Sequence, residues 1–197
     1  MKKTYAKIIM SMIFGVMVFS RTYGSTFHWE GAISNDWNNP NNWLELSLPT
    51  SSDDVVFNAG SYDCLLNCPT SINSLYIQAD YGYQLTIPTG CNLYLSGNLK
   101  IEVADNWNIW AEKPNITLCG SNSQTIEIVN YTEWTLETLT INKPAGDVTL
   151  NSNITVRPNG FFNETSTPII DNSYIIIGAC TPPVTGGIYH IANDFAI

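Results

Sequence analysis

The sequence predicts an all-β fold, wound as a parallel β-helix whose short strands stack in successive coils. Three observations favour it: short strand-like triplets, intervening segments rich in Gly, Asn and Pro, and an internal echo of the triplet pattern. Most triplets read apolar, polar, apolar, as expected of a strand with one buried face. They occupy residues 55–57, 75–77, 85–87, 93–95, 99–101, 116–118, 126–128, 139–141, 148–150 and 154–156, with 174–177 closing the series.

The internal echo relates residues 85–101 to residues 139–156, with nearly the same offset at each matching apolar position. Leu85 corresponds to Leu139, Leu93 to Val148 and Leu99 to Ile154. We interpret this offset as two coils of about 20–30 residues each, whose equivalent strands pair at the ~4.8 Å sheet spacing. Glycines and asparagines then take the corners, where left-handed backbone is needed.

The alternative is a β-sandwich of similar hairpins. It would call for several hairpin turns, but Asn159-Gly160 is the only Asn-Gly pair that fits one. The sequence therefore favours parallel coils over antiparallel hairpins.

The N-terminal segment has the order of a secretory signal. Three lysines precede an apolar run at residues 8–19, and small residues follow as far as Gly24. The run is too short for a stable membrane span. We therefore predict a signal peptide at residues 1–24, a mature start at Ser25, and a secreted or cell-surface protein without a transmembrane span in its mature form.

The remainder of the chain divides by composition into three parts. A Trp- and Asn-rich N-terminal cap module is predicted at residues 25–58, β-helix coils at 59–180, and an irregular C-terminal coil or tail at 181–197. The whole chain has a net charge of −9, and removal of the signal takes away four of its eight basic residues, which leaves −13. Nucleic acid and anionic membranes are therefore not expected as partners.

The segment at residues 27–57 differs from the coils that follow. It contains Trp29-Glu30-Gly31, Ser34-Asn35-Asp36-Trp37, Asn42-Trp43, Pro49 and Asp53-Asp54-Val55. With this pattern the chain resembles the opening module of secreted and cell-surface β-helix repeat proteins of bacteria, adhesin-like and autotransporter-passenger-like. The resemblance implies a right-handed parallel β-helix and a surface or secreted role in adhesion or matrix building, and it brings no assigned catalytic residues.

Three tryptophans of this module are predicted to form an aromatic cap. The open end of a solenoid exposes apolar core and an unpaired strand edge, and it needs a cover. Trp29, Trp37 and Trp43 are suited to this, since each large aromatic removes ~150–250 Å² from water. The alternative is a platform on which the apolar face of a sugar ring stacks.

Other aromatic residues are candidates for an exposed ligand-binding face. They fall in the longer segments between predicted strands, where a side chain is free to face solvent. These residues are Tyr81, Tyr83, Trp107, Trp110 and Trp134.

The five cysteines all follow the predicted signal, which favours a disulfide over a metal site. Cys68 and Cys91 are separated by about one coil, so stacking would bring them to bonding distance. Cys64 and Cys68 could instead close a tight loop. We predict one bridge among these three and leave Cys180 without a partner in the chain. The sequence shows no Cys-x-x-Cys motif and no histidine cluster, and no metal ion or cofactor is expected.

A catalytic centre is not predicted, because the sequence lacks the usual patterns of nucleophile, base and paired acids. His28 and His190 lie at opposite ends of the mature chain. We expect a non-enzymatic binding or structural module that contacts carbohydrate or a surface protein, with assembly through the solenoid ends left open. The alternatives are a β-sandwich carbohydrate-binding module and a small or degenerate polysaccharide lyase.

Overall fold

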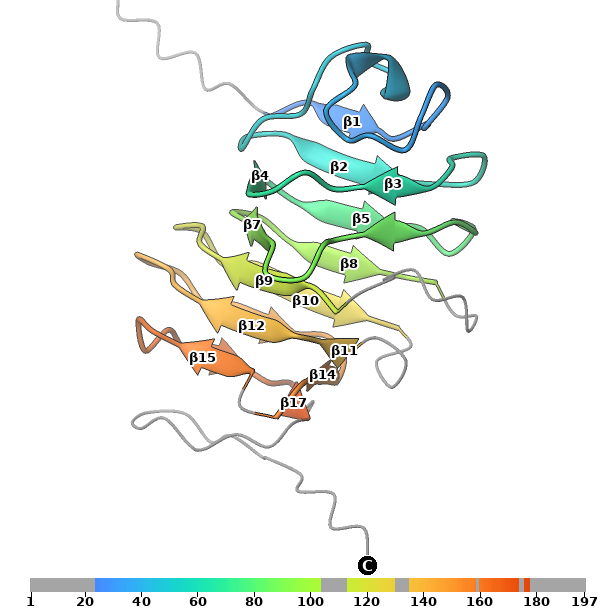
Figure 1. The fold of residues 1–197 in the computed structure, drawn as a ribbon. Coiled ribbons are helices and arrows are strands. Elements are labelled where there is room, and N and C mark those ends of the chain that lie inside the picture. Colours follow the sequence, from blue (N-terminus) through green and yellow to red (C-terminus); the bar gives the residue numbers. More distant parts are fainter. Residues whose placement is uncertain (1–23, 104–112, 130–134, 159, 174–175, 178–197) are drawn as a thin grey trace, which may run out of the picture.

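The chain winds as a parallel β-helix in the computed structural model, which describes residues 24–103, 113–129, 135–158, 160–173 and 176–177 (Figure 1). Every pair of strands among these residues is parallel, and partners come from neighbouring coils. The predicted parallel β-helix is therefore confirmed. The β-sandwich alternative is wrong, because its hairpins would pair sequence neighbours in antiparallel fashion.

The largest face of the solenoid is a seven-stranded sheet that runs along the whole described structure. Its strands follow one another in the order β1, β2, β5, β8, β10, β13 and β16. Their bounds are Thr26–His28, Asp54–Phe57, Leu75–Ile77, Leu99–Ile101, Gln124–Ile128, Val148–Leu150 and Ile169–Ile170.

A second face is a five-stranded sheet, and shorter sheets close the coils. The five strands are β4 (Thr70–Ile72), β7 (Asn92–Leu95), β9 (Asn115–Leu118), β12 (Thr138–Ile141) and β15 (Phe161–Asn163). One short sheet pairs β3 (Cys64–Leu65) with β6 (Leu85–Thr86). The other joins β11 (Thr135–Leu136), β14 (Ile154–Val156) and β17 (Ile176–Ile177). The described residues contain one helical turn, the 3-10 turn η1 (Pro40–Asn42).

The core consists of inward side chains that stack from coil to coil. Leu93, Ile116 and Leu139 are successive register partners on the five-stranded face, and each is at most 1% exposed. Each buried Leu or Ile contributes about 1.5–3 kcal/mol relative to an exposed one. The stack therefore supplies a continuous apolar column along the solenoid.

Coil length is uneven along the seven-stranded face. The shortest interval between partners beyond the N-terminal loop joins Val55 to Leu75, and the longest joins Leu99 to Ile126. Both intervals fall within the predicted range of about 20–30 residues for one coil. The predicted coil length is therefore confirmed.

The interpretation of the internal echo is wrong, because the echoed segments lie on different faces. Leu85 belongs to the short sheet of β3 and β6, whereas Leu139, its predicted equivalent, belongs to the five-stranded sheet. Leu93 and Val148 are also on different faces. Every face buries alternate residues, so the apolar pattern does not identify the face to which a strand belongs.

The predicted strands and the described ones agree where the apolar pattern is strong. Each triplet from residues 55–57 to 154–156 overlaps a strand, while of residues 174–177 only the last two are described. The strands that were missed are mostly short or carry a polar residue at a buried position, such as Thr70. They are β1, β3, β4, β11, β15 and β16.

The N-terminal module is a loop inserted between two strands of the main sheet. β1 and β2 pair with each other, so residues 29–53 leave the solenoid after one strand and rejoin it at the next. In Figure 1 this loop, with η1, lies over the N-terminal end of the coils. The loop is therefore joined to the main sheet at both of its ends, through β1 and β2.

The three cap tryptophans are buried in this loop. Trp29 and Trp43 are 0% exposed and Trp37 is 4% exposed. Their rings contact one another, and Trp29 also lies 6.1 Å from the ring of Phe57, a core residue of β2. This burial fits a cover for the end of the solenoid and does not fit an exposed sugar platform.

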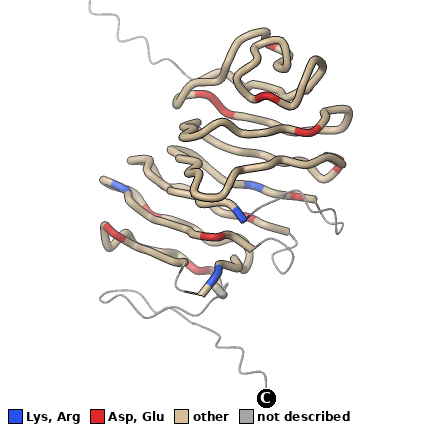
Figure 2. Tube along the Cα trace, viewed as in Figure 1, with Lys and Arg blue, Asp and Glu red and all other residues tan. Residues whose placement is uncertain are grey.

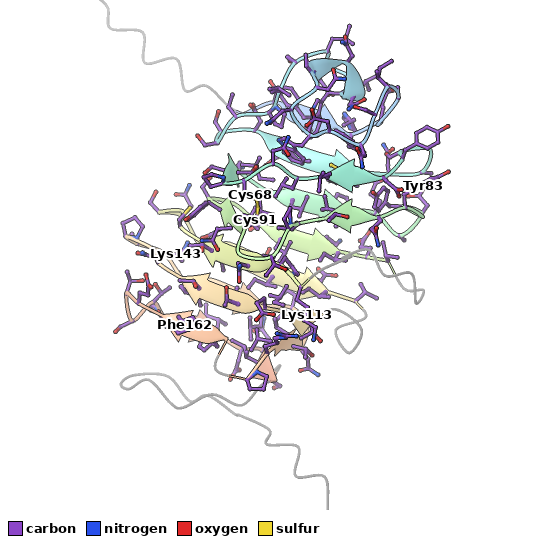
Figure 3. All side chains as sticks on the ribbon, viewed as in Figure 1. Cys68, Tyr83, Cys91, Lys113, Lys143 and Phe162 are labelled. Carbon is purple, nitrogen blue, oxygen red and sulfur yellow. A yellow bond between two sulfur atoms is a disulfide. The ribbon has the colours of Figure 1, made fainter. Side chains whose placement is uncertain are left out.

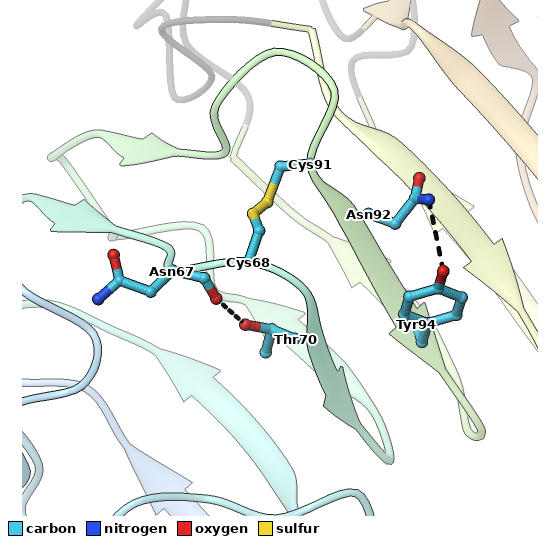
Figure 4. The surroundings of a disulfide bond; sticks show 6 residues. All are labelled: Asn67, Cys68, Thr70, Cys91, Asn92 and Tyr94. Atoms are coloured by element: carbon cyan, nitrogen blue, oxygen red, sulfur yellow. Dashed lines mark hydrogen bonds between the residues drawn. A yellow bond between two sulfur atoms is a disulfide. The ribbon is translucent and has the colours of Figure 1, made fainter.

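A disulfide joins Cys68 to Cys91, with Cα atoms 5.5 Å apart (Figure 4). It links the segment before β4 to the segment before β7, one coil further along. Of the two pairings left open by the sequence, the one between coils is present. Cys64 is free and buried, Cys119 is free, and Cys180 lies outside the described residues.

Candidate functional site

Of the five aromatic residues predicted to bind a ligand, one is exposed, one is buried and three are not described by the structure. Trp107, Trp110 and Trp134 lie outside the described residues. Tyr83 is 43% exposed and lies at a corner of the solenoid near its N-terminal coils (Figure 3). The prediction for Tyr81 as an exposed ligand residue is wrong, because Tyr81 is only 1% exposed.

Tyr81 is part of the core because the turn after β5 folds its ring inward. The ring packs against Phe57 at 5.2 Å between centroids, and its hydroxyl donates to the Tyr62 carbonyl at 3.2 Å. Burial raises the pKa of this hydroxyl far above its ordinary value. Tyr81 is therefore a core residue that holds the backbone of Tyr62 and does not face solvent.

Tyr83 borders a shallow hollow of about 330 Å³, which we call the tyrosine hollow. The second exposed aromatic there is Tyr62, 54% exposed, whose ring centroid lies 5.2 Å from that of Tyr83. The two tyrosines precede the paired strands β3 and β6, so they occupy neighbouring coils. The lining residues are Gly31, Ala32, Ile33, Ser34, Asn35, Tyr62, Asp63 and Tyr83.

Buried groups hold the backbone at Tyr62. Its carbonyl accepts hydrogen bonds from the Trp29 indole at 2.9 Å and from the Tyr81 hydroxyl, and its N–H donates to the Glu30 carbonyl at 3.0 Å. Tyr81 and Trp29 are both buried. The backbone of Tyr62 is thus fixed by buried groups, and a fixed backbone is the kind of preorganisation that lowers the entropic cost of binding at a surface.

The opposite wall is organised by Asn42, a fully buried side chain. Its carbonyl oxygen accepts the N–H groups of Ile33 and Ser34 at 3.0 and 2.9 Å. Its amide donates to the Ser34 hydroxyl at 3.0 Å and to the Asp36 carbonyl at 2.8 Å. These four bonds use the whole hydrogen-bonding capacity of the side chain and fix the loop that lines the hollow.

Sequence reasoning found Tyr83 but missed Tyr62 and the residues around Ile33. The available signal was the spacing of Tyr62 and Tyr83, which is close to one coil. No comparable signal marked residues 31–35, because they are brought to the hollow by the inserted loop. The hydrogen bonds of Asn42 fix the shape of this loop, and the bond from the Tyr62 N–H to the Glu30 carbonyl joins the loop to the hollow.

A second hollow, of about 340 Å³, crosses the outer face of the seven-stranded sheet. It contains Tyr76 and Lys100, with the Lys100 ammonium 5.4 Å from the tyrosine ring centroid. Glu102, next to it, accepts hydrogen bonds from Lys100 at 2.6 Å and from the Tyr76 hydroxyl.

This trio stays in its ordinary protonation states at neutral pH. The hydrogen bond to Glu102 raises the pKa of Tyr76 and that of Lys100, and the bonds from Lys100 and Tyr76 lower the pKa of Glu102. A general acid or base works best with a pKa near the working pH. All three pKa values are shifted away from neutral pH, so the arrangement does not favour acid–base catalysis at this hollow.

The aspartates of the N-terminal module serve local structure. Asp53 accepts hydrogen bonds from the N–H groups of Ser25 and Thr50, both at 2.8 Å, and from the Thr50 hydroxyl at 2.6 Å. Burial acts to raise the pKa of Asp53, but these bonds outweigh it and the pKa lies below its ordinary value. In the part of the chain that the structure describes, no three His, Cys, Asp or Glu side chains are grouped as a metal site would require.

In comparisons with known proteins, no family model, curated protein or solved structure matches the chain. Within the described ranges, no helix has the length and apolar character needed to cross a membrane.

Proposed function

We propose that this chain is a secreted or cell-surface, adhesin-like binding module that contacts carbohydrate through the tyrosine hollow. The observation that carries the proposal is the pair of exposed rings, Tyr62 and Tyr83, held 5.2 Å apart over a preorganised loop. Sugar rings have apolar faces that pack on aromatic rings, and small-ligand sites combine such surfaces with a few well-placed polar groups. Ser34, Asn35 and Asp63 supply these polar groups at the rim.

Two observations support export. The first is the signal-like order of the N-terminal segment. The second is the Cys68–Cys91 disulfide, since such bonds persist mainly in oxidising compartments.

The proposed role is non-enzymatic. Its support is the Tyr76, Lys100 and Glu102 trio, whose pKa shifts keep the tyrosine neutral, the lysine protonated and the glutamate ionised at neutral pH. A small or degenerate polysaccharide lyase is the alternative from a different class. It predicts turnover of an acidic polysaccharide, which an absorbance assay for unsaturated products would detect.

A glycan array followed by titration calorimetry tests the binding proposal. We expect Tyr62→Ala and Tyr83→Ala to weaken binding by about tenfold or more, the effect of losing ~1.4 kcal/mol. Phe162→Ala is the matched control, because Phe162 is an exposed aromatic, 45% exposed, on β15 at the other end of the solenoid. Trp107→Ala and Trp110→Ala test two of the three remaining predicted residues.

The proposal is contradicted if no glycan binds, or if the two tyrosine variants bind as tightly as the unmodified protein. Circular dichroism of each variant shows whether the β-helix persists, so that a loss of binding is not confused with unfolding.

A further inference from the structure

The tyrosine hollow lies in a part of the chain that carries only negative formal charge. Between Arg21 and Lys100 the sequence has no Lys or Arg. Figure 2 shows the consequence in space: the coils nearest the N-terminal loop have acidic segments and no basic ones. The acidic residues of this stretch are Glu30, Asp36, Glu45, Asp53, Asp54, Asp63 and Asp80.

One of these acids, Asp63, lines the hollow directly. It is solvent-exposed, and one of its oxygens accepts the N–H of Gln84 at 3.0 Å, which ties the side chain to the strand end beside Tyr83. No lysine or arginine is among the lining residues. A cationic group bound against the tyrosines therefore meets a carboxylate at short range and no opposing positive charge.

Two attractive effects act on such a cation. Opposite charges attract each other more strongly near a protein surface than in bulk water, because the dielectric there is lower. The faces of Tyr62 and Tyr83 add a cation–π attraction. A neutral sugar receives neither contribution.

We propose that the ligand of the tyrosine hollow is an amino sugar with a free, protonated amine, as in glucosamine oligomers. This inference rests on the proposed carbohydrate function and adds the charge of the ligand. The apolar face of the sugar packs on the tyrosines, and the ammonium is attracted by Asp63 and by the surrounding acids. N-acetylation removes the positive charge but keeps the ring, and so it isolates the electrostatic part.

The test compares glucosamine oligomers with N-acetylglucosamine oligomers of equal length by titration calorimetry. We expect the free-amine oligomer to bind about tenfold more tightly at low salt. This preference shrinks as sodium chloride rises toward about 1 M, where the Debye length is about 3 Å.

Asp63→Asn separates the charge from the ring contacts. The asparagine keeps an oxygen that accepts the Gln84 N–H, so the loop geometry is preserved while the charge is lost. We expect the preference to fall toward unity, because binding of the free-amine oligomer weakens more than binding of the N-acetylated oligomer. Asp80→Asn is the matched control, because Asp80 is an exposed acid of the same stretch that does not line the hollow.

The outcomes distinguish this inference from the function on which it rests. Equal binding of both oligomers, or a preference that survives Asp63→Asn, overturns the amino-sugar inference and leaves carbohydrate binding intact. If no oligomer and no arrayed glycan binds, both proposals fail. Binding of poly-lysine that persists in Tyr83→Ala would show general attraction of cationic polymers and would also overturn the inference.

Discussion

A single lysine illustrates how individual residues hold the coils together. Lys143, labelled in Figure 3, is only 2% exposed, and its ammonium donates to the carbonyls of Gly120 and Asn122, both at 2.8 Å. It also donates to the side chain of Gln124, which in turn donates to the Leu95 carbonyl at 3.0 Å. These bonds connect corners of three successive coils inside the solenoid.

We expect Lys143→Met to lower the free energy of unfolding by about 1–3 kcal/mol, because the buried oxygens lose their donor. Burial lowers the pKa of Lys143, so the unfolded chain binds more protons at alkaline pH, and this lysine adds stability as pH rises toward ~10.4. The difference in free energy of unfolding between the unmodified protein and Lys143→Met should therefore grow as pH rises from neutral toward ~10.4. Urea denaturation at several pH values measures this difference.

Lys113→Met is the control for this prediction, since Lys113 is exposed. A loss of stability in Lys113→Met equal to that in Lys143→Met would contradict the assigned role. So would a difference for Lys143→Met that shrinks as pH rises.

The sequence contains no signal that tells which of these two lysines is buried. The same is true of the two tyrosines in the turn after β5. Tyr81 and Tyr83 stand two positions apart in one turn, yet the first ring is core and the second is exposed. The sequence shows that this turn carries two tyrosines, but it does not show which of them is buried. The turn geometry that decides which ring faces inward depends on the coil below, where Phe57 receives Tyr81.

At the level of elements, strand positions follow from the sequence but strand partners do not. Alternation of apolar and polar residues marks strands such as β5 and β8, because each needs only one buried face. Register between coils depends on loop lengths, and the interval from Val55 to Leu75 is shorter than that from Leu99 to Ile126. The constant offset between residues 85–101 and 139–156 therefore relates strands that belong to different sheets.

Glycines at the coil corners allow successive coils to stack closely. Gly120 follows β9 and packs on the preceding coil, where an added Cβ would lie 1.9 Å from the Ser96 carbonyl oxygen. That atom belongs to backbone and has little room to move. The corner accepts no side chain unless the two coils separate.

We expect Gly120→Ala to lower the free energy of unfolding by about 1–3 kcal/mol, the usual cost of overpacking. Gly82→Ala is the matched control, since an added Cβ there meets nothing within 4 Å and the backbone has no positive φ. Thermal unfolding followed by circular dichroism compares the two. Equal melting temperatures for the two variants would show that the corner is more compliant than the contact implies.

At the level of the whole molecule, a solenoid must protect the strand edges at its ends. The N-terminal loop covers two of them with backbone hydrogen bonds. Leu44 donates to the carbonyl of His28 on β1 at 3.0 Å, and Trp37 donates to the carbonyl of Leu65 on β3 at 3.1 Å. The Glu45 carboxylate accepts the N–H of His28 at 2.9 Å, so it occupies a further edge position of β1. Covered edges discourage strand addition by another chain.

Trp43 is a fully buried residue of this cover and packs against both other tryptophans. Its ring lies 4.6 Å from that of Trp37 and 5.1 Å from that of Trp29, and its indole N–H donates to the Trp37 carbonyl at 2.9 Å. We expect Trp43→Ala to cost about 3–5 kcal/mol of stability, as large aromatic truncations in cores do. Because the loop would then release the edges of β1 and β3, self-association should rise with protein concentration.

Sedimentation velocity over a concentration series, together with urea denaturation, measures both effects. Trp43→Phe keeps most of the apolar contact and should recover most of the stability, which separates packing from the indole hydrogen bond. Phe162→Ala removes an exposed aromatic at the opposite end and should change neither quantity by much. If Trp43→Ala lost stability without any gain in self-association, the loop would be a packing element of the first coil and not a guard of the strand edges.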